Sequence, residues 1–305
     1  MLTQSENILL NEILSDIKSI GNNNLLHSAK NFNARSEAID FIEFHVIDRI
    51  NALLEKNQGS DALDDLKKYA LQIRKDLGEI NLEMFYFLRV KISKEKIRGQ
   101  YFLTLINEYL DHDFGAESTE EGYDSLDIFL NGLLSDQKPP PETREREPEM
   151  VFYQKTPSRI IFDLIKKSAF KPQDVFFDLG SGLGQAVILV NLLTGIKSIG
   201  VEYEPAFCGY ARSKAEVLNL PDVDFTNEDA RYADYSSGTV FFMYTPFEGK
   251  ILDEVLQRLK KESENRKIKV FTYGPCTPEV AKQPWLKNKK KIKNYLTEPG
   301  EFESI

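Results

Sequence analysis

Three glycines at alternate positions follow an apolar run in the stretch "VFFDLGSGLGQ", residues 175–185. Glycine permits positive φ angles and close approach of the backbone to a ligand, so such a turn after a strand is typical of a nucleotide-like cofactor site. The spacing of Gly180, Gly182 and Gly184 is G-x-G-x-G, which differs from the dinucleotide pattern G-x-G-x-x-G, and no G-K-[ST] follows. Asp178, at the end of the apolar run, would repel a pyrophosphate and favours a cationic cofactor.

Two more acids follow the next two apolar runs. Glu202 ends the run in "SIGVEYEP", with Glu204 as its rival, and Asp229 lies in "FTNEDARY". Carboxyl ends of parallel strands meet at one edge of a sheet, where ligands bind. S-adenosylmethionine carries an ammonium and a sulfonium and no phosphate, so it is the predicted cofactor. We expect Asp178 to bind its ammonium, Glu202 its ribose hydroxyls and Asp229 its adenine amino group.

The elements that position these acids alternate between strand and helix. Apolar runs predict strands at Val175–Leu179, Ser198–Glu202, Val223–Thr226, Thr239–Tyr244 and Lys269–Tyr273. Helical periodicity predicts helices at Ser158–Ser168, Gln185–Leu193, Ala206–Leu218 and Leu252–Lys261. Strands that alternate with helices indicate βαβ units, an α/β fold and a mostly parallel sheet.

The first ~135 residues show only the helical period. One run, from Ile39 to Leu54, has a candidate N-cap at Ser36, and another spans roughly Asp61 to Leu77. The proline-rich, charged stretch "SDQKPPPETREREPEM" follows and is typical of a linker. We therefore predict an all-α domain at residues 1–135, a linker at 136–149 and the cofactor-binding domain at 150–305.

The acids and glycines also carry a family resemblance. Asp178 to Gln185 reads D-L-G-S-G-x-G-Q, Gly200 to Glu202 reads G-V-E, and Tyr153 and Thr156 stand three residues apart before a helix. This pattern resembles the class I S-adenosylmethionine-dependent methyltransferases, and within them the Dot1-like histone-lysine methyltransferase branch, over roughly residues 150–259. The resemblance implies a Rossmann-like sheet, Ser181 and Gln185 at the cofactor, Tyr153 and Thr156 in a loop over it, and a protein lysine as methyl acceptor.

The segment after the fourth predicted strand differs from that branch. Where the branch has an N-N-F segment beside its lysine channel, this chain has Tyr244, Thr245, Pro246 and Phe247. We predict that these four residues line the acceptor site, with the aromatic rings contacting the sulfonium methyl by cation–π attraction. The alternative is a proline turn whose aromatic rings pack under the sheet. A small-molecule methyltransferase and a non-catalytic module that binds a cofactor or partner also stay open.

The amino-acid composition limits the kinds of molecule that the protein is expected to bind. The 305 residues have a formal net charge of −9, and the one basic concentration, "KNKKKIKNY" at residues 287–295, is more typical of a solvated loop than of a nucleic-acid patch. Cys208 and Cys276 have no zinc spacing, and the three histidines have no partner at metal spacing, so no metal site is predicted. No apolar run approaches the ~20 residues that span a bilayer. We expect a cytoplasmic protein.

Overall fold

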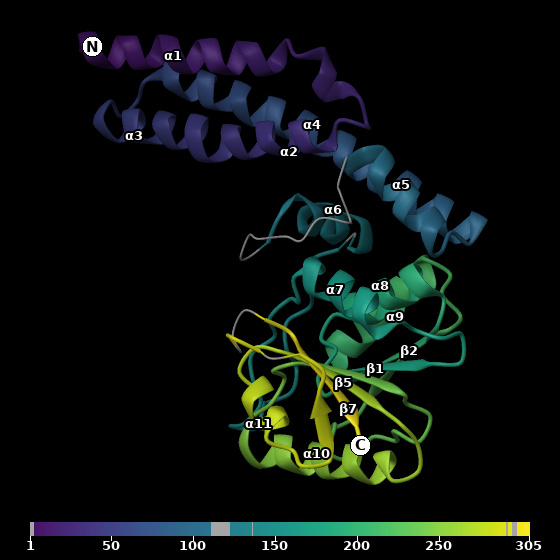
Figure 1. Ribbon diagram of the computed structural model, residues 1–305. Helices are drawn as coiled ribbons and strands as arrows, with labels where there is room; N and C mark the ends of the chain where they lie inside the picture. Colours follow the sequence, from purple (N-terminus) through teal and green to yellow (C-terminus); the bar gives the residue numbers. More distant parts are fainter. Residues whose placement is uncertain (1–2, 111–122, 136, 291, 295–297) are drawn as a thin grey trace. The chain divides into compact units, whose positions relative to one another are not determined.

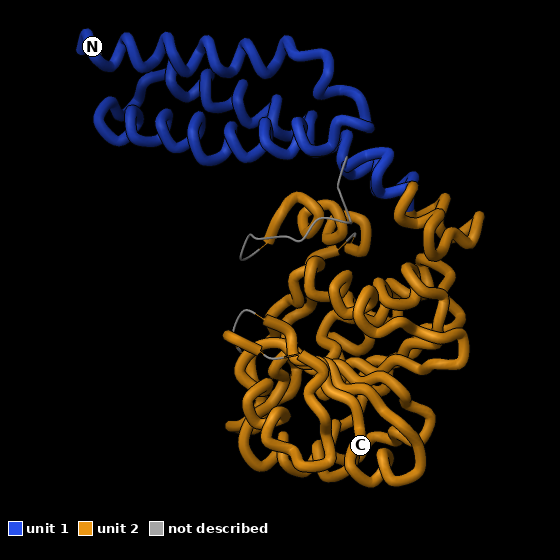
Figure 2. Tube along the Cα trace, in the orientation of Figure 1, with its two compact units in different colours: residues 1–88, 105–112 blue, residues 89–104, 113–305 orange. Residues whose placement is uncertain are grey.

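The computed structural model describes residues 3–110, 123–135, 137–290, 292–294 and 298–305 (Figure 1). The chain divides into two compact units, residues 1–88 with 105–112 and residues 89–104 with 113–305 (Figure 2). The predicted domains at 1–135 and 150–305 divide the chain elsewhere, and their boundaries stay a prediction. Of the predicted linker, residue 136 lies outside the described residues.

The helical unit is built on amphipathic helices around an aliphatic core. α1 begins at a capping box in which Thr3 and Glu6 satisfy each other's backbone N–H groups, and its Ile13 and Ile17 are buried. The core also contains Ile50, Leu63 and other aliphatic residues of the following helices. The helical elements up to residue 110 are α1 (Gln4–Gly21), η1 (Asn24–His27), α2 (Phe32–Phe41), η2 (Ile42–Ile47), α3 (Asp48–Lys56), α4 (Asp61–Glu95) and α5 (Gln100–Leu110); residues 89–104, at the end of α4 and the start of α5, belong to the second unit.

Two sequence predictions for the helices are wrong. Ser36 is not an N-cap, because α2 already begins at Phe32 and Ser36 is buried inside it; a π-helical turn, η2, then joins α2 to α3. α4 does not end near Leu77 but continues to Glu95. Gly78 is tolerated inside this helix because buried apolar positions such as Leu88 and Ile92 continue the period beyond it.

The second unit contains a seven-stranded sheet with strand order β3-β2-β1-β4-β5-β7-β6. β1 to β5 pair in parallel, β7 is antiparallel to β5, and β6 is antiparallel to β7. The strands are β1 (Val175–Leu179), β2 (Lys197–Glu202), β3 (Val223–Asn227), β4 (Val240–Tyr244), β5 (Lys269–Tyr273), β6 (Leu286–Asn288) and β7 (Gly300–Ser304). β1 lies inside the sheet between β2 and β4, where the direction of strand addition reverses, so its carboxyl end is the expected ligand edge.

Helices cover both faces of this sheet (Figure 1). α7, α8 and α9 lie over one face, and α10 and α11 lie against the other. Phe241, Val270 and Val255 belong to the core between the sheet and α10, and all three are inaccessible to solvent. The helices of this unit are α6 (Ser125–Leu134), α7 (Ser158–Ser168), α8 (Gln185–Thr194), α9 (Pro205–Val217), α10 (Gly249–Ser263) and α11 (Thr277–Ala281). The α/β Rossmann-like fold with a helical N-terminal region is thereby confirmed.

The sequence reading missed β6 and β7. β7 has the sequence "GEFES", with Phe302 as its one large apolar residue, so no apolar run marks it. β6 begins with Leu286 and overlaps the basic stretch that was predicted to be a solvated loop; Lys289, which follows it, forms an ion pair with Glu303. Residues 291 and 295 of that stretch lie outside the described residues. In the part of the chain that the structure describes, no helix has the length and apolar character needed to cross a membrane.

Candidate functional site

The glycine turn joins β1 to α8 with left-handed backbone at all three glycines, with φ of 79° at Gly180, 53° at Gly182 and 82° at Gly184. A Cβ on Gly180 would lie 2.2 Å from Pro246, and one on Gly182 would lie 2.2 Å from the ring of Tyr153. Both side chains therefore sit directly on the turn, in space that only glycine leaves free.

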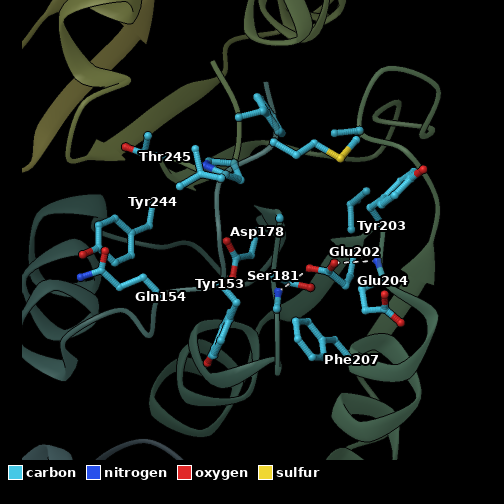
Figure 3. Close-up of a pocket in the computed structure, with 18 of the residues that line it drawn as sticks. Tyr153, Gln154, Asp178, Ser181, Glu202, Tyr203, Glu204, Phe207, Tyr244 and Thr245 are labelled. Carbon is cyan, nitrogen blue, oxygen red and sulfur yellow. Dashed lines mark hydrogen bonds between the residues drawn. The ribbon is translucent and has the colours of Figure 1, made fainter. Parts of the chain in front are cut away.

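A pocket opens over this turn, at the carboxyl ends of the parallel strands (Figure 3). It has about 1010 Å³ of empty space, which includes space open to solvent. Every site residue predicted from the sequence lines it except Gly184: Tyr153, Thr156, Asp178, Gly180, Ser181, Gly182, Gln185, Glu202, Asp229, Tyr244, Thr245, Pro246 and Phe247. A Cβ on Gly184 would meet Phe225 and Ala211 instead, so this glycine serves the packing of helix on sheet.

Asp178 lies in the centre of the pocket without a polar partner. Its side chain is 5% exposed, and no residue of the described chain donates a hydrogen bond to it. Burial, and then the neighbouring Glu202, raise the pKa of Asp178 to about 8. A buried carboxylate without donors is costly, so this position favours a bound cation.

Glu202 ends β2 and is fixed by the backbone. One of its carboxylate oxygens accepts from the Gly182 N–H at 2.6 Å and the other from the Glu204 N–H at 2.8 Å. Burial raises the pKa of Glu202, and these backbone N–H groups act against the rise. The carboxylate is therefore held in one orientation toward the pocket (Figure 3).

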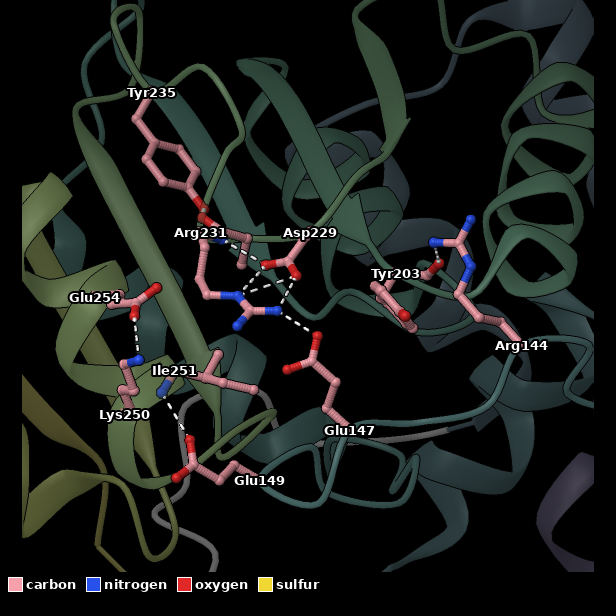
Figure 4. Close-up of polar contacts among 11 residues, drawn as sticks. Arg144, Glu147, Glu149, Tyr203, Asp229, Arg231, Tyr235, Lys250, Ile251 and Glu254 are labelled. Carbon is pink, nitrogen blue, oxygen red and sulfur yellow. Dashed lines mark hydrogen bonds and ion pairs between the residues drawn. The ribbon is translucent and has the colours of Figure 1, made fainter.

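Asp229, after β3, is paired with Arg231 (Figure 4). Its oxygens accept from the Arg231 backbone N–H at 2.8 Å and from the guanidinium at 2.6 Å, and the same guanidinium pairs with Glu147. Burial alone would raise the pKa of Asp229, but the bonds from Arg231 outweigh it and lower the pKa. Asp229 is thus an ionised acceptor at the pocket rim.

A segment that the sequence analysis read as part of the linker lies across the strand ends; we call residues 142–149 the crossing segment. Thr143 donates to Glu204 through its N–H at 2.9 Å and through its hydroxyl, and Arg144 N–H donates at 2.8 Å. Farther along, Glu149 accepts from the Ile251 N–H at 2.9 Å (Figure 4). Glu204, the rival of Glu202, therefore anchors this segment.

These contacts determine the charge of Glu204. Burial would raise the pKa of Glu204, but the hydrogen bonds from Thr143, Ala206 and Arg144 lower it to about 2. Glu204 also caps the N-terminus of α9 by accepting from the Ala206 N–H. The only sequence sign of this role was an acid directly before the proline that begins α9.

The loop before α7 forms the opposite wall. The Tyr153 ring packs on Gly182 and makes an edge contact with Phe207, with ring centroids 5.5 Å apart. Burial raises the pKa of the Tyr153 hydroxyl, so the phenol is neutral. Thr156 lines the same wall, before α7.

A buried acid outside the predicted set supports this wall. Asp127 of α6 accepts from the Ser158 N–H at 2.7 Å, at the first residue of α7. The Ser158 hydroxyl in turn accepts from Gln185 Nε2 at 3.3 Å, at the start of α8. Burial raises the pKa of Asp127 against the effect of these bonds. The sequence reading had assigned α6 to the helical domain and offered no sign of this contact.

The last residue of β4, Tyr244, and the three residues that follow it have different surroundings. Tyr244 faces the pocket, and its ring lies 5.0 Å from that of Tyr273. Thr245 is buried with φ of 39°, and its hydroxyl donates to the Tyr273 carbonyl at 3.0 Å and accepts from the Cys276 N–H at 3.2 Å. Phe247 belongs to the core cluster around α10 and also lines the pocket.

Among these four residues, Tyr244 alone presents an unengaged polar group, since no residue of the described chain hydrogen-bonds to its hydroxyl. Pro246 packs on the glycine turn through Gly180. The wall of the pocket at the end of β4 therefore has one phenol, and Thr245 and Pro246 shape the turn that follows it.

Part of the chain is similar to known methyltransferases. The family model described as "Histone methylation protein DOT1" matches residues 149–221. An RNA methyltransferase from Salinibacter ruber, solved in complex with S-adenosyl-L-homocysteine, is 22% identical with a TM-score of 0.39, over 50% of this chain and 92% of that one. A SAM-dependent methyltransferase from Geobacter sulfurreducens, also in complex with S-adenosyl-L-homocysteine, is 23% identical with a TM-score of 0.31, over 38% of this chain and 48% of that one.

The ribosomal protein L11 methylase from Lactobacillus delbrueckii subsp. bulgaricus is 14% identical with a TM-score of 0.39, over 48% of this chain and 77% of that one. No curated protein matches the chain. The sheet and the family-model match define the class: the second unit has the fold of the class I S-adenosylmethionine-dependent methyltransferases. Within that class, residues 149–221 have Dot1-like similarity, which confirms the resemblance inferred from the glycine turn.

Proposed function

We propose that the protein binds S-adenosylmethionine and transfers its methyl group to a nitrogen acceptor. The observation that carries the proposal is Asp178, a buried carboxyl group without a hydrogen-bond donor in the described chain, at the carboxyl end of β1. An ammonium supplies the missing charge and donors at this position. A phosphate group would bring its negative charge to two buried carboxyl groups, Asp178 and Glu202, and would be repelled by either one when it is ionised.

The other residues of the pocket fit the rest of the cofactor. Glu202 retains acceptor capacity for ribose hydroxyls, because each of its oxygens receives one backbone bond. Asp229 lies at the pocket rim where an adenine amino group is expected, and because each of its oxygens already accepts two bonds from Arg231, that amino group would share them with the guanidinium. Two further buried lining atoms, Ser181 Oγ and Gln185 Oε1, have no partner in the described chain. These unpaired groups support a polar ligand in the pocket.

The chain's contribution to the reaction is positioning. The bound cofactor supplies a methyl group on a sulfonium. The acceptor nitrogen forms the new N–C bond, the S–C bond breaks with its electron pair left on sulfur, and the nitrogen gives a proton to water. Burial raises the pKa of Tyr244 to about 12, so its phenol stays protonated at neutral pH and does not act as a base. We therefore propose an acceptor that is neutral when it reacts, held in line by the turn at Tyr244 to Phe247.

The Dot1-like similarity supports a protein lysine as acceptor, and a small molecule is the alternative. Labelling of a cell lysate with tritiated S-adenosylmethionine, resolved by gel and by small-molecule extraction, distinguishes the two. Label in a protein band supports the first, and label in the extract supports the second. Tight cofactor binding by calorimetry with no label in either fraction would instead support the non-catalytic module. The two free cysteines, Cys208 and Cys276, support a reducing compartment such as the cytoplasm.

A further inference from the structure

Arg231 joins the Asp229 carboxylate to the crossing segment (Figure 4). Its backbone N–H donates to Oδ1 of Asp229 at 2.8 Å, and its Nη2 donates to Oδ2 at 2.6 Å. Nε is shared between the two oxygens, at 3.0 Å from one and 3.1 Å from the other. Nη2 also donates to Glu147 of the crossing segment at 2.5 Å. The Arg231 side chain is 15% exposed, so it is largely buried between these two acids.

The shared bond from Nε leaves room for one more donor at Asp229. A single N–H that lies between two oxygens bonds neither of them at full strength. A second donor can therefore replace half of this bond while the backbone N–H and Nη2 keep the carboxylate in place. The amino group of adenine is such a donor. Asp229 lines the pocket, and neither Arg231 nor Glu147 is among the lining residues of the described chain, so Arg231 acts on a ligand through Asp229.

Arg231 also keeps Asp229 ionised. Burial raises the pKa of this carboxyl group, and the bonds from Arg231 outweigh burial and lower the pKa. An ionised carboxylate only accepts hydrogen bonds, so it attracts the amino group of adenine and repels the carbonyl oxygen that hypoxanthine, the deaminated base, carries at the same position. Without Arg231, Asp229 would lose its fixed orientation and part of its charge, and with them its ability to distinguish the two bases.

The crossing segment supports this end of the pocket at a second point. Arg144 donates to the Tyr203 carbonyl at 3.0 Å, and its guanidinium lies 4.5 Å from the centre of the Tyr203 ring, within the range of cation–π attraction. Tyr203 lines the pocket. Tyr203 and Asp229 follow the neighbouring strands β2 and β3, so the segment holds residues after two strand ends from outside the pocket.

We propose that Arg231 is the positioning residue that makes the pocket select adenine: it holds the Asp229 carboxylate for the base and is itself held by Glu147. This inference rests on the proposed function, because it concerns the cofactor of the same site. A site built to bond an amino group rejects an analogue that lacks this group more strongly than a pocket that selects by shape alone. Glu147 of the crossing segment therefore contributes to base selectivity without lining the pocket.

The test compares S-adenosyl-L-homocysteine with its deaminated analogue, S-inosyl-L-homocysteine, by calorimetry. The wild type should bind the first at least about tenfold more tightly, as expected for a hydrogen bond to a charged group. Arg231→Gln should bring the two affinities close to equality, and Arg231→Lys, which keeps a charged donor, should restore part of the ratio. Glu147→Ala should lower the ratio, and it should have no further effect when it is added to Arg231→Gln, because it acts through Arg231.

Arg266→Gln is the matched control. Arg266 is a partly buried arginine of the same unit that pairs with Glu262 at 2.7 Å and donates to the Gly238 carbonyl at 2.8 Å, before the start of β4. This variant should lose stability and keep the affinity ratio, which a purely structural role of Arg231 would also leave unchanged.

Two results would overturn the inference while cofactor binding still stands: equal affinity of the wild type for the two ligands, or an unchanged or higher ratio in Arg231→Gln. If Arg231→Gln does not fold, Glu147→Ala decides the matter, since Glu147 is 42% exposed and its ratio should still fall. If the wild type binds neither ligand, the proposed function fails, and the inference fails with it.

Discussion

Asp178→Asn should weaken cofactor binding and, at the same time, stabilise the protein without cofactor. Asparagine keeps the shape of the side chain and removes its charge. Burial, and then Glu202, raise the pKa of Asp178 from 3.8 to about 8, so at pH 7 roughly nine tenths of the carboxyl is protonated. A bound ammonium requires the ionised form, and binding at pH 7 should therefore release close to one proton from this site.

The two effects of the substitution have opposite signs. Loss of a hydrogen bond to a charged group costs about 1.5–3 kcal/mol, which corresponds to roughly 10- to 150-fold weaker cofactor binding. A raised carboxyl pKa means that the folded state binds the proton more tightly than the unfolded state. Stability therefore falls as pH rises from the ordinary value of 3.8 to about 8. Asparagine has no such penalty, so the variant should melt higher than the wild type at pH 8–9, with no gain below about pH 4.

Calorimetry with S-adenosyl-L-homocysteine in two buffers of different ionisation enthalpy measures affinity and proton release together. Thermal melts across pH measure stability. Asp174→Asn is the control: its carboxylate, at the other end of β1, accepts from Thr239 Oγ1 at 2.9 Å and from the Lys171 N–H at 2.8 Å. That variant should lose stability and keep its cofactor affinity. Unchanged affinity in Asp178→Asn, or a lower melting temperature at pH 8–9, would refute the assignment of Asp178 as the cation site.

Three further substitutions test the walls of the pocket. Gly182→Ala should weaken S-adenosyl-L-homocysteine binding at least about tenfold in calorimetry and lower the free energy of unfolding by about 1–3 kcal/mol. The reason is that Gly182 has a φ of 53° and that an added Cβ would lie 2.2 Å from the Tyr153 ring. The affinity should recover partly when Tyr153→Ala is added. Glu204→Gln should destabilise the protein by about 1–3 kcal/mol and, by releasing Thr143, expose the crossing segment to limited proteolysis. The pKa of Glu204 is lowered from 4.5 to about 2, so the loss of stability relative to the wild type should be full above pH 4.5 and vanish toward pH 2. Asp127→Ala should lower the melting temperature and weaken cofactor binding severalfold, whereas Asp127→Asn, which keeps an acceptor for the α7 backbone, should retain most of both; equal losses in the two variants would contradict the capping role.

The sequence predicted helices and strands well where a local periodic pattern of apolar residues determines which residues are buried. α7 has the predicted bounds, Ser158–Ser168, and β1 the predicted bounds, Val175–Leu179, because an amphipathic face and a buried strand are both local patterns. β7 escaped prediction because its register comes from pairing with β5, in which Val270 lies opposite Phe302. Such long-range pairing leaves no apolar run in a five-residue strand.

Some residues of the candidate site could likewise be predicted from local sequence patterns, and others could not. Asp178, Glu202 and Asp229 were predictable because the ends of parallel strands meet, whatever the rest of the chain does. The contact of Glu204 with Thr143, 61 residues away in sequence, and the burial of Phe247 in the core beside the pocket were not, because tertiary contacts decide them. Position after a strand end predicts which backbone borders a ligand, and it does not predict whether a side chain faces the ligand or the core.

The chain before residue 150 completes the pocket. Asp127 bonds the first backbone N–H of α7, and Ser158 at that position accepts from Gln185, which begins α8 at the glycine turn. α7 has a proline at its N-cap and no side-chain cap of its own, so the free N–H groups of its first turn depend on this acid from another helix. A chain cut at the predicted boundary of 150 would lose both Asp127 and the crossing segment. The cofactor site therefore needs α6 and residues 142–149 as well as the sheet, although neither segment contains a sequence motif that indicates ligand binding.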